Sequence, residues 1–122
     1  MPGVIAAVED LFFGARLLET ARQLSVPLRL VNSATDLLTQ ARTSRPDLVI
    51  LDLDAAGCRP LDAIRELKAD PDLAATPVLG FLSHLHRDLK RAAAEAGCDR
   101  ILARSAFTAE LAEILRQGAP PS

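Results

Sequence analysis

The stretch Pro46–Lys68, PDLVILDLDAAGCRPLDAIRELK, decides the fold of this chain. It begins with a short apolar run that ends at Asp52, and a loop of small residues follows. Its last part places Leu61, Ile64 and Leu67 on one side of a helix. A buried strand followed by a loop and an amphipathic helix is typical of α/β proteins with a parallel sheet.

The same alternation of short apolar runs and helical segments continues along the whole chain. We expect five strands, at Val4–Val8, Pro27–Val31, Leu48–Leu51, Val78–Leu82 and Arg100–Ala103. Ser33 has the residue type that begins a helix, Thr108 is expected to open the last helix, and Gly97 is expected to end the fourth. The pattern predicts one α/β domain over residues 1–117, with helices on both faces of a parallel sheet, and a flexible tail at 118–122.

The composition is that of an ordinary globular domain. The chain has 122 residues, of which 49% are hydrophobic and 25% are charged, and its formal net charge is −2. Both charge signs are mixed along the sequence, which disfavours direct binding to nucleic acid. No apolar run approaches the roughly 20 residues of a membrane span, so we expect no membrane insertion and a cytoplasmic location. Cys58 and Cys98 are then expected to be unbonded thiols.

Acidic residues follow the first and third expected strands. Glu9 and Asp10 come directly after the first strand, Asp52 ends the third, and Asp54 follows two residues later. Ligands bind at such strand ends in open parallel sheets, and neighbouring first and third strands would bring these acids together. Closely spaced carboxylates call for a cation, and an all-oxygen site suits Mg²⁺. The alternative is that some of these acids, above all Asp10, cap a following helix or face water.

The sequence resembles the receiver domains of bacterial response regulators. Pro46–Lys68 is similar to the third strand, loop and third helix of that family, and VIAAVED (Val4–Asp10) is similar to its first strand and acidic pair. The similarity continues through TPVLGFLSHL and AGCDRILARSAF. The resemblance implies a flavodoxin-like (βα)5 fold with strand order 2-1-3-4-5.

The same resemblance implies roles for the acidic residues. Asp52 would be the phosphoacceptor, and Glu9 and Asp10 would hold Mg²⁺ directly or through water. The backbone carbonyl of Asp54 would complete the protein ligands of the metal. Such an ion would neutralise charge while an anionic carboxylate attacks an anionic phosphoryl donor.

Several positions depart from the receiver pattern. The usual Thr or Ser at the end of the fourth strand falls on Leu82, although Ser83 follows it and is a candidate hydroxyl. The usual Lys falls on Arg104, which keeps the charge but is larger, and the usual aromatic residue of the fifth strand falls on Ile101. His84 stands at the rim of the expected site, where it would bind a phosphoryl oxygen or simply face solvent.

Two further features lie near the expected site. Gly57 stands in the loop after Asp52, where we expect a tight turn. Phe12 and Phe13 directly follow the acidic pair. We expect them to pack in the core, and the alternative is that one of them is exposed over the pocket or contacts a partner.

Two functions from different classes remain open. The first is a stand-alone receiver that accepts a phosphoryl group on Asp52 from a histidine kinase or phosphotransfer protein. It would signal by binding another protein through residues from about 85 to about 115, either as a monomer or as a homodimer. It would be no enzyme beyond its own phosphorylation and dephosphorylation. The second is a pseudo-receiver, an adaptor that works without phosphorylation, which the departures at Leu82, Ile101 and Arg104 favour. A Gly-rich phosphate loop is absent, which disfavours nucleotide binders.

Overall fold

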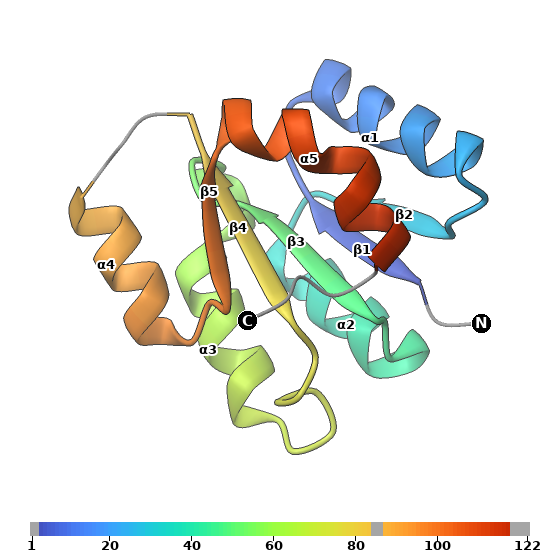
Figure 1. Ribbon diagram of the computed structural model, residues 1–122. Helices are drawn as coiled ribbons and strands as arrows, with labels where there is room; N and C mark the ends of the chain where they lie inside the picture. The colour runs from blue at the N-terminus through green and yellow to red at the C-terminus, as the bar shows by residue number, and fades with distance from the viewer. Residues whose placement is uncertain (1–2, 84–86, 118–122) are drawn as a thin grey trace.

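The computed structural model of the protein describes residues 3–83 and 87–117, so the expectation for His84 lies outside the described residues. Five parallel strands form one sheet in the order β2-β1-β3-β4-β5 (Figure 1). Their bounds are Val4–Ala7 for β1, Leu28–Val31 for β2, Leu48–Asp52 for β3, Val78–Leu82 for β4 and Arg100–Ala103 for β5. The flavodoxin-like fold and its strand order are therefore confirmed, and each strand end lies within one residue of its expected place.

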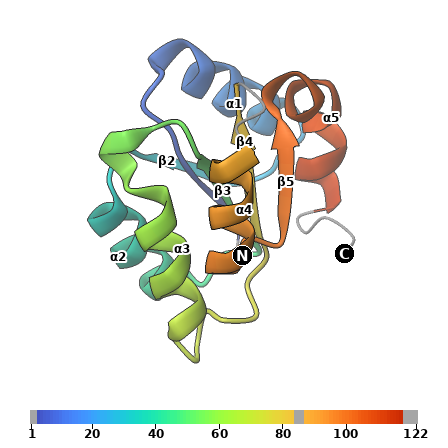
Figure 2. The ribbon, with the colours of Figure 1, turned by 90° about the vertical axis from the view of Figure 1, so that its left-hand side faces the viewer.

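The helices cover both faces of this sheet. Their bounds are Leu11–Gln23 for α1, Ala34–Ser44 for α2, Pro60–Ala69 for α3, Arg87–Ala96 for α4 and Arg104–Gln117 for α5, and a short 3₁₀ helix, η1, spans Ala56–Cys58. Helices α1 and α5 pack on one face, while α2, α3 and α4 pack on the other (Figure 2). No helix of the described residues is long and apolar enough to cross a membrane.

Strand β3 lies in the middle of the sheet and is buried on both faces. Its side chains alternate, because successive residues of a strand point to opposite faces. Val49 and Leu51 belong to the core beneath α2, α3 and α4, whereas Leu48 and Ile50 belong to the core beneath α1 and α5. Asp52 ends this buried strand and lies opposite Phe81 of β4 in the sheet.

Two of the three expected helix ends are confirmed. The Ser33 side chain accepts a hydrogen bond of 3.1 Å from the N–H of Asp36 and caps α2. Gly97 follows α4 with a φ of +114°, the left-handed conformation that glycine adopts most easily. The expectation for Thr108 is wrong, because α5 begins at Arg104 and the Thr108 hydroxyl donates to the Arg104 carbonyl within it. Strand β5 thus leads into α5 without a loop.

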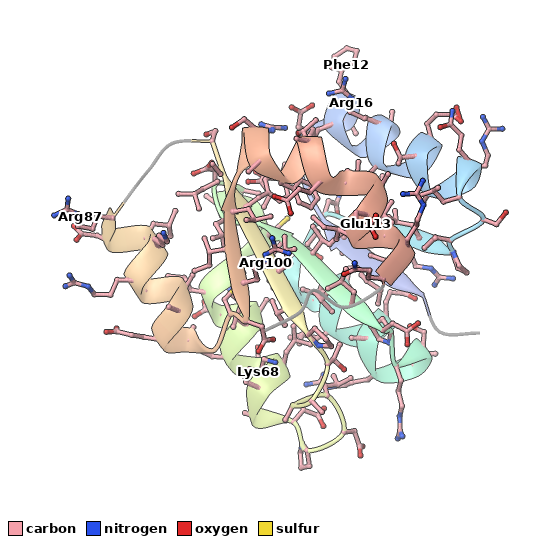
Figure 3. The ribbon with its side chains drawn as sticks, in the orientation of Figure 1. Phe12, Arg16, Lys68, Arg87, Arg100 and Glu113 are labelled. Carbon is pink, nitrogen blue, oxygen red and sulfur yellow. The ribbon has the colours of Figure 1, made fainter. Side chains whose placement is uncertain are left out.

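The first helix begins directly after the acidic pair and separates the two neighbouring phenylalanines. Phe13 is buried, whereas Phe12 is 92% exposed and projects from the end of α1 (Figure 3). Successive helical residues are rotated by about 100°, so Phe12 and Phe13 point in different directions. Leu18 of the same helix is half-exposed at 42%. The core expectation therefore holds for Phe13 and is wrong for Phe12.

Candidate functional site

Asp52 is the buried acid at the centre of the candidate site. It is 7% exposed, and within residues 3–83 and 87–117 no other charged side chain is buried. Its Oδ1 accepts a hydrogen bond of 2.9 Å from the N–H of Asp54. No buried side-chain nitrogen or oxygen of the described residues lacks a hydrogen-bond partner. Since Oδ2 of Asp52 accepts none from these residues, it must be in contact with solvent.

The surroundings of Asp52 disfavour its ionised form. Burial is the main cause that raises the pKa of Asp52, and the negative charges of Asp54 and Glu9 raise it further. The hydrogen bond from the Asp54 N–H and the positive charge of Arg104 lower the pKa but do not outweigh these causes. The ionised form of Asp52 is therefore disfavoured, mainly by burial.

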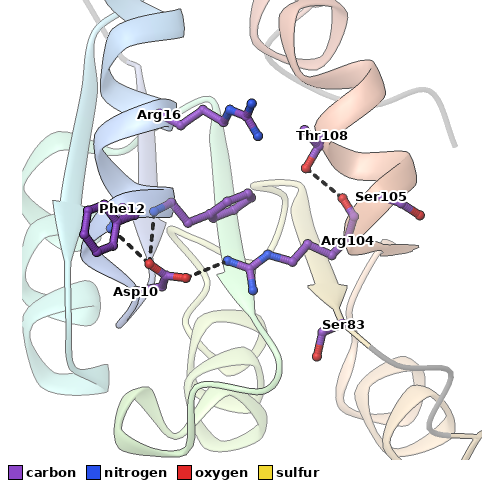
Figure 4. Close-up of a pocket in the computed structure, with 8 residues that line it drawn as sticks. Asp10, Phe12, Arg16, Ser83, Arg104, Ser105 and Thr108 are labelled. Carbon is purple, nitrogen blue, oxygen red and sulfur yellow. Dashed lines mark hydrogen bonds and ion pairs between the residues drawn. The ribbon is translucent and has the colours of Figure 1, made fainter.

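Asp10 faces the start of α1 and Arg104. Its Oδ1 accepts from the N–H groups of Phe12 and Phe13 at 3.0 and 3.1 Å, which caps the helix. Its Oδ2 accepts from Nη2 of Arg104 at 3.2 Å (Figure 4). The hydrogen bond from Phe13 is the largest cause that lowers the pKa of Asp10, although burial opposes it, and Arg104 lowers it as well. The capping role considered for Asp10 is thus confirmed.

Arg104 lies on an aromatic cluster. Its guanidinium carbon is 4.1 Å from the centre of the Phe13 ring and 5.8 Å from that of Phe81. Phe81 stacks on Phe107 with ring centres 4.6 Å apart, and Phe13 lies 5.1 Å from Phe81. The cation and the ring faces attract each other. Among the described contacts Arg104 donates no hydrogen bond to Asp52 and acts on it through charge.

The candidate hydroxyl of Ser83 is directed to Asp54. The N–H and hydroxyl of Ser83 both donate to Oδ2 of Asp54, at 2.6 and 2.8 Å. Leu82, at the usual hydroxyl position, is buried in the core beneath α2, α3 and α4, and Ile101 packs against the same core. The hydrogen bonds of Ser83 join the ends of β3 and β4 through Asp54. At the position where the resemblance to receivers leads us to expect a hydroxyl, the chain has the aliphatic side chain of Leu82.

Glu9 lies against the loop that follows β3. A Cβ at Gly57 would overlap the Glu9 carboxylate, so the end of the Glu9 side chain packs directly against this glycine. Gly57 does lie in a tight turn, the 3₁₀ helix η1, but without the positive φ that favours glycine. Burial, with smaller contributions from Glu9 and Asp52, raises the pKa of Cys58 to about 11. Glu9 therefore lies close to Asp52, Gly57 and Cys58.

The structure brings only part of the expected acidic cluster together. Glu9 and Asp52 are neighbours, whereas both oxygens of Asp10 are engaged by α1 and Arg104. Within the described part of the chain, no three His, Cys, Asp or Glu residues are grouped as a metal site. The donor chemistry of the expected ligands nevertheless suits Mg²⁺, because all of their donor atoms are oxygens and the carboxylates of Glu9 and Asp52 lie near each other.

An open groove adjoins the acidic residues. It lies between the start of α1 and the start of α5 and has a volume of about 550 Å³. Figure 4 shows Arg16 reaching toward it from α1 and Arg104 from the opposite side. We call it the α1–α5 groove, and its lining residues are Asp10, Phe12, Phe13, Arg16, Ser83, Arg104, Ser105 and Thr108. Sequence analysis did not predict this groove, since its two sides are far apart in the chain.

Solved structures of response regulators share this fold. The response regulator from Hahella chejuensis matches with a TM-score of 0.85 and 15% identity, over 97% of this chain and 95% of that one. The chemotaxis response regulator CheY4 of Vibrio cholerae matches with a TM-score of 0.83 and 15% identity, over 97% and 98%. The Mn²⁺-bound response regulator Rcp1 matches with a TM-score of 0.69 and 21% identity, over 99% and 100%. No family model and no curated protein sequence matches the chain.

Proposed function

We propose that this chain, which has the fold of response-regulator receiver domains, is a signalling receiver with Asp52 as its phosphoacceptor. The observation that carries the proposal is the setting of this carboxylate. It is buried at the end of β3, Oδ1 is held by the N–H of Asp54, and Oδ2 reaches solvent. A carboxylate fixed through one oxygen presents the other as a nucleophile.

The proposed reaction is a phosphoryl transfer to Oδ2 of Asp52. This oxygen forms a bond to phosphorus while the bond to the donor's nitrogen or oxygen breaks and the donor keeps that electron pair. The product is an acyl phosphate. Glu9, Asp52, the backbone carbonyl of Asp54 and, through water, Asp10 would hold Mg²⁺, which would neutralise charge on the phosphoryl group. The Mn²⁺-bound Rcp1 structure supports a divalent ion in this fold.

Arg104 would bind the transferred phosphoryl group. Its guanidinium carries more N–H donors than its bond to Asp10 uses, and its planar fork suits two phosphoryl oxygens. To reach Asp52 it would turn away from Asp10 and the Phe13 ring. Ser83 would have to release Asp54 before its hydroxyl could take part. We also propose His84 as a further hydrogen-bond donor.

Partners follow from the same proposal. A histidine kinase or a phosphotransfer protein in the cytoplasm would supply the phosphoryl group, and another protein would bind α4, β5 and α5, residues 85–115 or so. We propose one domain over residues 1–117 with a tail at 118–122, alone or as a homodimer. The net charge of −2 offers no basis for direct nucleic-acid binding.

A second candidate function is an adaptor that signals without phosphorylation. The specific observation in its favour is that Arg104 already has partners, Asp10 at 3.2 Å and the Phe13 ring at 4.1 Å. Leu82 also leaves no hydroxyl at the usual position. In an adaptor, these contacts would hold the starts of α1 and α5 in one conformation, and a partner protein would bind that conformation.

Phosphorylation by a small donor separates the two candidates. The protein would be incubated with Mg²⁺ and acetyl phosphate, and its intact mass compared with those of Asp52→Asn and Asp62→Asn. Asp62 is a matched control, because it is exposed on α3 and pairs only with Arg65 among the described residues.

The receiver proposal expects one phosphoryl group on the wild type and on Asp62→Asn, and none on Asp52→Asn or without Mg²⁺. An adduct that persists in Asp52→Asn would reject Asp52 as the acceptor. No adduct on any variant would favour the adaptor.

A further inference from the structure

The α1–α5 groove has an excess of positive charge, and one of its two cations, Arg16, has no part in the proposed phosphoryl transfer. Two of its lining side chains are arginines, Arg16 from α1 and Arg104 from α5, and its one lining carboxylate is Asp10. Two positive charges and one negative charge leave a formal excess of one positive charge. The start of α5 adds partial positive charge at the same place. The groove therefore favours an anion.

Arg16 is the cation in this groove that lacks a partner. Within residues 3–83 and 87–117 it makes no hydrogen bond or ion pair. By contrast Arg22, two turns further along α1, pairs with Glu19 at 2.6 Å. Figure 3 shows Arg16 beside Phe12 at the end of α1, and Figure 4 shows it extending over the groove. Its guanidinium is therefore available to a ligand.

The remaining donors in the groove suit a phosphate group. The side chain of Arg104 has N–H donors beyond the one bound to Asp10, and Ser105 lines the groove beside it in the first turn of α5. Thr108 already donates its hydroxyl proton to the carbonyl of Arg104, so it adds no donor. Guanidinium groups bind carboxylate or phosphate oxygens through two parallel hydrogen bonds, and a phosphate has enough oxygens to accept from two guanidinium groups at once.

We propose that the α1–α5 groove binds a small phosphorylated metabolite, with its phosphate held between Arg16 and Arg104. The groove, at about 550 Å³, falls within the roughly 300–1,000 Å³ that small-molecule sites occupy. Inorganic phosphate would fill only part of it, so the ligand carries an organic group as well. This site shares Arg104 with the proposed phosphoryl-transfer site but uses Arg16 in place of Oδ2 of Asp52, so its binding does not require phosphorylation of Asp52.

Titration with two probes tests the proposal. Inorganic phosphate and ribose 5-phosphate would be added at about pH 8, where both are dianions, and binding followed by ¹H–¹⁵N NMR of the backbone amides and arginine Nε–H groups. Sodium chloride at matched ionic strength is the reference. The proteins are the wild type, Asp52→Asn, Arg16→Gln and, as the matched control on the same helix, Arg22→Gln.

We expect saturable shifts at Arg16, Arg104 and Ser105, with a dissociation constant for phosphate on the order of 1 mM. Ribose 5-phosphate should bind more tightly than phosphate. Arg22→Gln should leave binding unchanged, Asp52→Asn should not weaken it, and Arg16→Gln should weaken it by about fivefold or more.

Four outcomes would overturn the proposal: shifts that do not saturate, equal shifts with chloride, equal weakening by Arg22→Gln, or binding lost in Asp52→Asn. Binding of ribose 5-phosphate no tighter than phosphate would overturn the assignment to a metabolite. The amide spectrum of Arg16→Gln shows directly whether that variant is folded, and Asp52→Asn separates this site from the phosphoacceptor.

Discussion

Arg104 should be energetically coupled to Phe13, and a double-mutant cycle of Arg104→Gln and Phe13→Leu measures that coupling. The guanidinium carbon lies 4.1 Å from the ring centre. A cation on an aromatic face contributes about 0.5–1 kcal/mol when exposed and about 2 kcal/mol when desolvated. Arg104 is 32% exposed at its side chain, whereas Phe13 is buried. We therefore expect a coupling free energy of about 1 kcal/mol.

Urea unfolding of the four proteins of the cycle supplies the free energies of unfolding. Phe13→Leu also removes the ring contacts with Phe81 and Phe107, at 5.1 and 6.0 Å. Arg104→Gln also removes the ion pair with Asp10. These losses occur in both the single and the double variants, so the cycle cancels them and leaves the contact between cation and ring.

A matched cycle of Arg116→Gln with Phe13→Leu provides the control. Arg116 lies on the same helix as Arg104 but pairs with Glu113. Distant sites add within about 0.3–0.5 kcal/mol, so this second coupling should be that small. If the coupling of Arg104 to Phe13 is equally small, the ring does not hold the guanidinium, and the reasoning that places Arg104 on Phe13 is refuted.

Three further predictions concern single residues. Asp52 has a folded-state pKa above its unfolded value of 3.8, so the wild type should lose stability as pH rises above that value. In urea unfolding, the advantage of Asp52→Asn should therefore grow from about pH 3 to pH 7, and an advantage that is constant with pH would contradict the raised pKa. Gly97→Ala should lower the free energy of unfolding by about 1 kcal/mol or more. The φ of Gly97 is +114°, and the new Cβ would lie 2.8 Å from Cγ of Lys68. A urea midpoint equal to that of the wild type would contradict this prediction. Cys58 and Cys98, with pKa values raised to about 11 by burial, should resist iodoacetamide in the folded protein at about pH 7.5 and react in urea. Rapid alkylation of the folded protein, followed by mass spectrometry, would show that the thiols are not protected.

The fold could be predicted because each strand is a short apolar run with a helical pattern after it. Pro46–Lys68 shows why this works: β3 is buried on both faces, so nearly every residue of Leu48–Leu51 had to be apolar. The position of Asp52 at the end of the strand could also be predicted, because a carboxylate is rarely tolerated in the middle of a strand that is buried on both faces. The expected acid at the end of β3 was thus a consequence of the pattern itself.

The contacts around Arg104 could not be predicted from the sequence. Asp10 and Arg104 are 94 positions apart, and no spacing rule relates them. The start of α5 was missed for a local reason. Thr108 has a residue type that often caps a helix, whereas β5 runs directly into α5 and Arg104 is already helical. Arg104, where the resemblance to receivers leads us to expect a lysine, therefore lies in the first turn of α5 and donates a hydrogen bond to Asp10.

Phe12 and Phe13 show how the start of one helix determines which of two neighbouring side chains is buried. The sequence alone left open whether Phe12 or Phe13 is exposed. Once Asp10 caps α1, helical geometry places Phe13 toward Phe81 and Phe12 in solvent. The signal was present in the sequence, since Asp is a common capping residue and a helical pattern begins directly after it.

Chemical trapping of the phosphorylated residue tests the central claim most directly. The protein treated with Mg²⁺ and acetyl phosphate would be reduced with borohydride, which converts an aspartyl phosphate to homoserine, and then digested and sequenced by mass spectrometry. We predict homoserine at position 52, with Asp54 of the same peptide intact. Homoserine at position 54 or elsewhere, or an unmodified Asp52 in a protein that carries the phosphoryl group, would contradict the assignment of Asp52 as the phosphoacceptor.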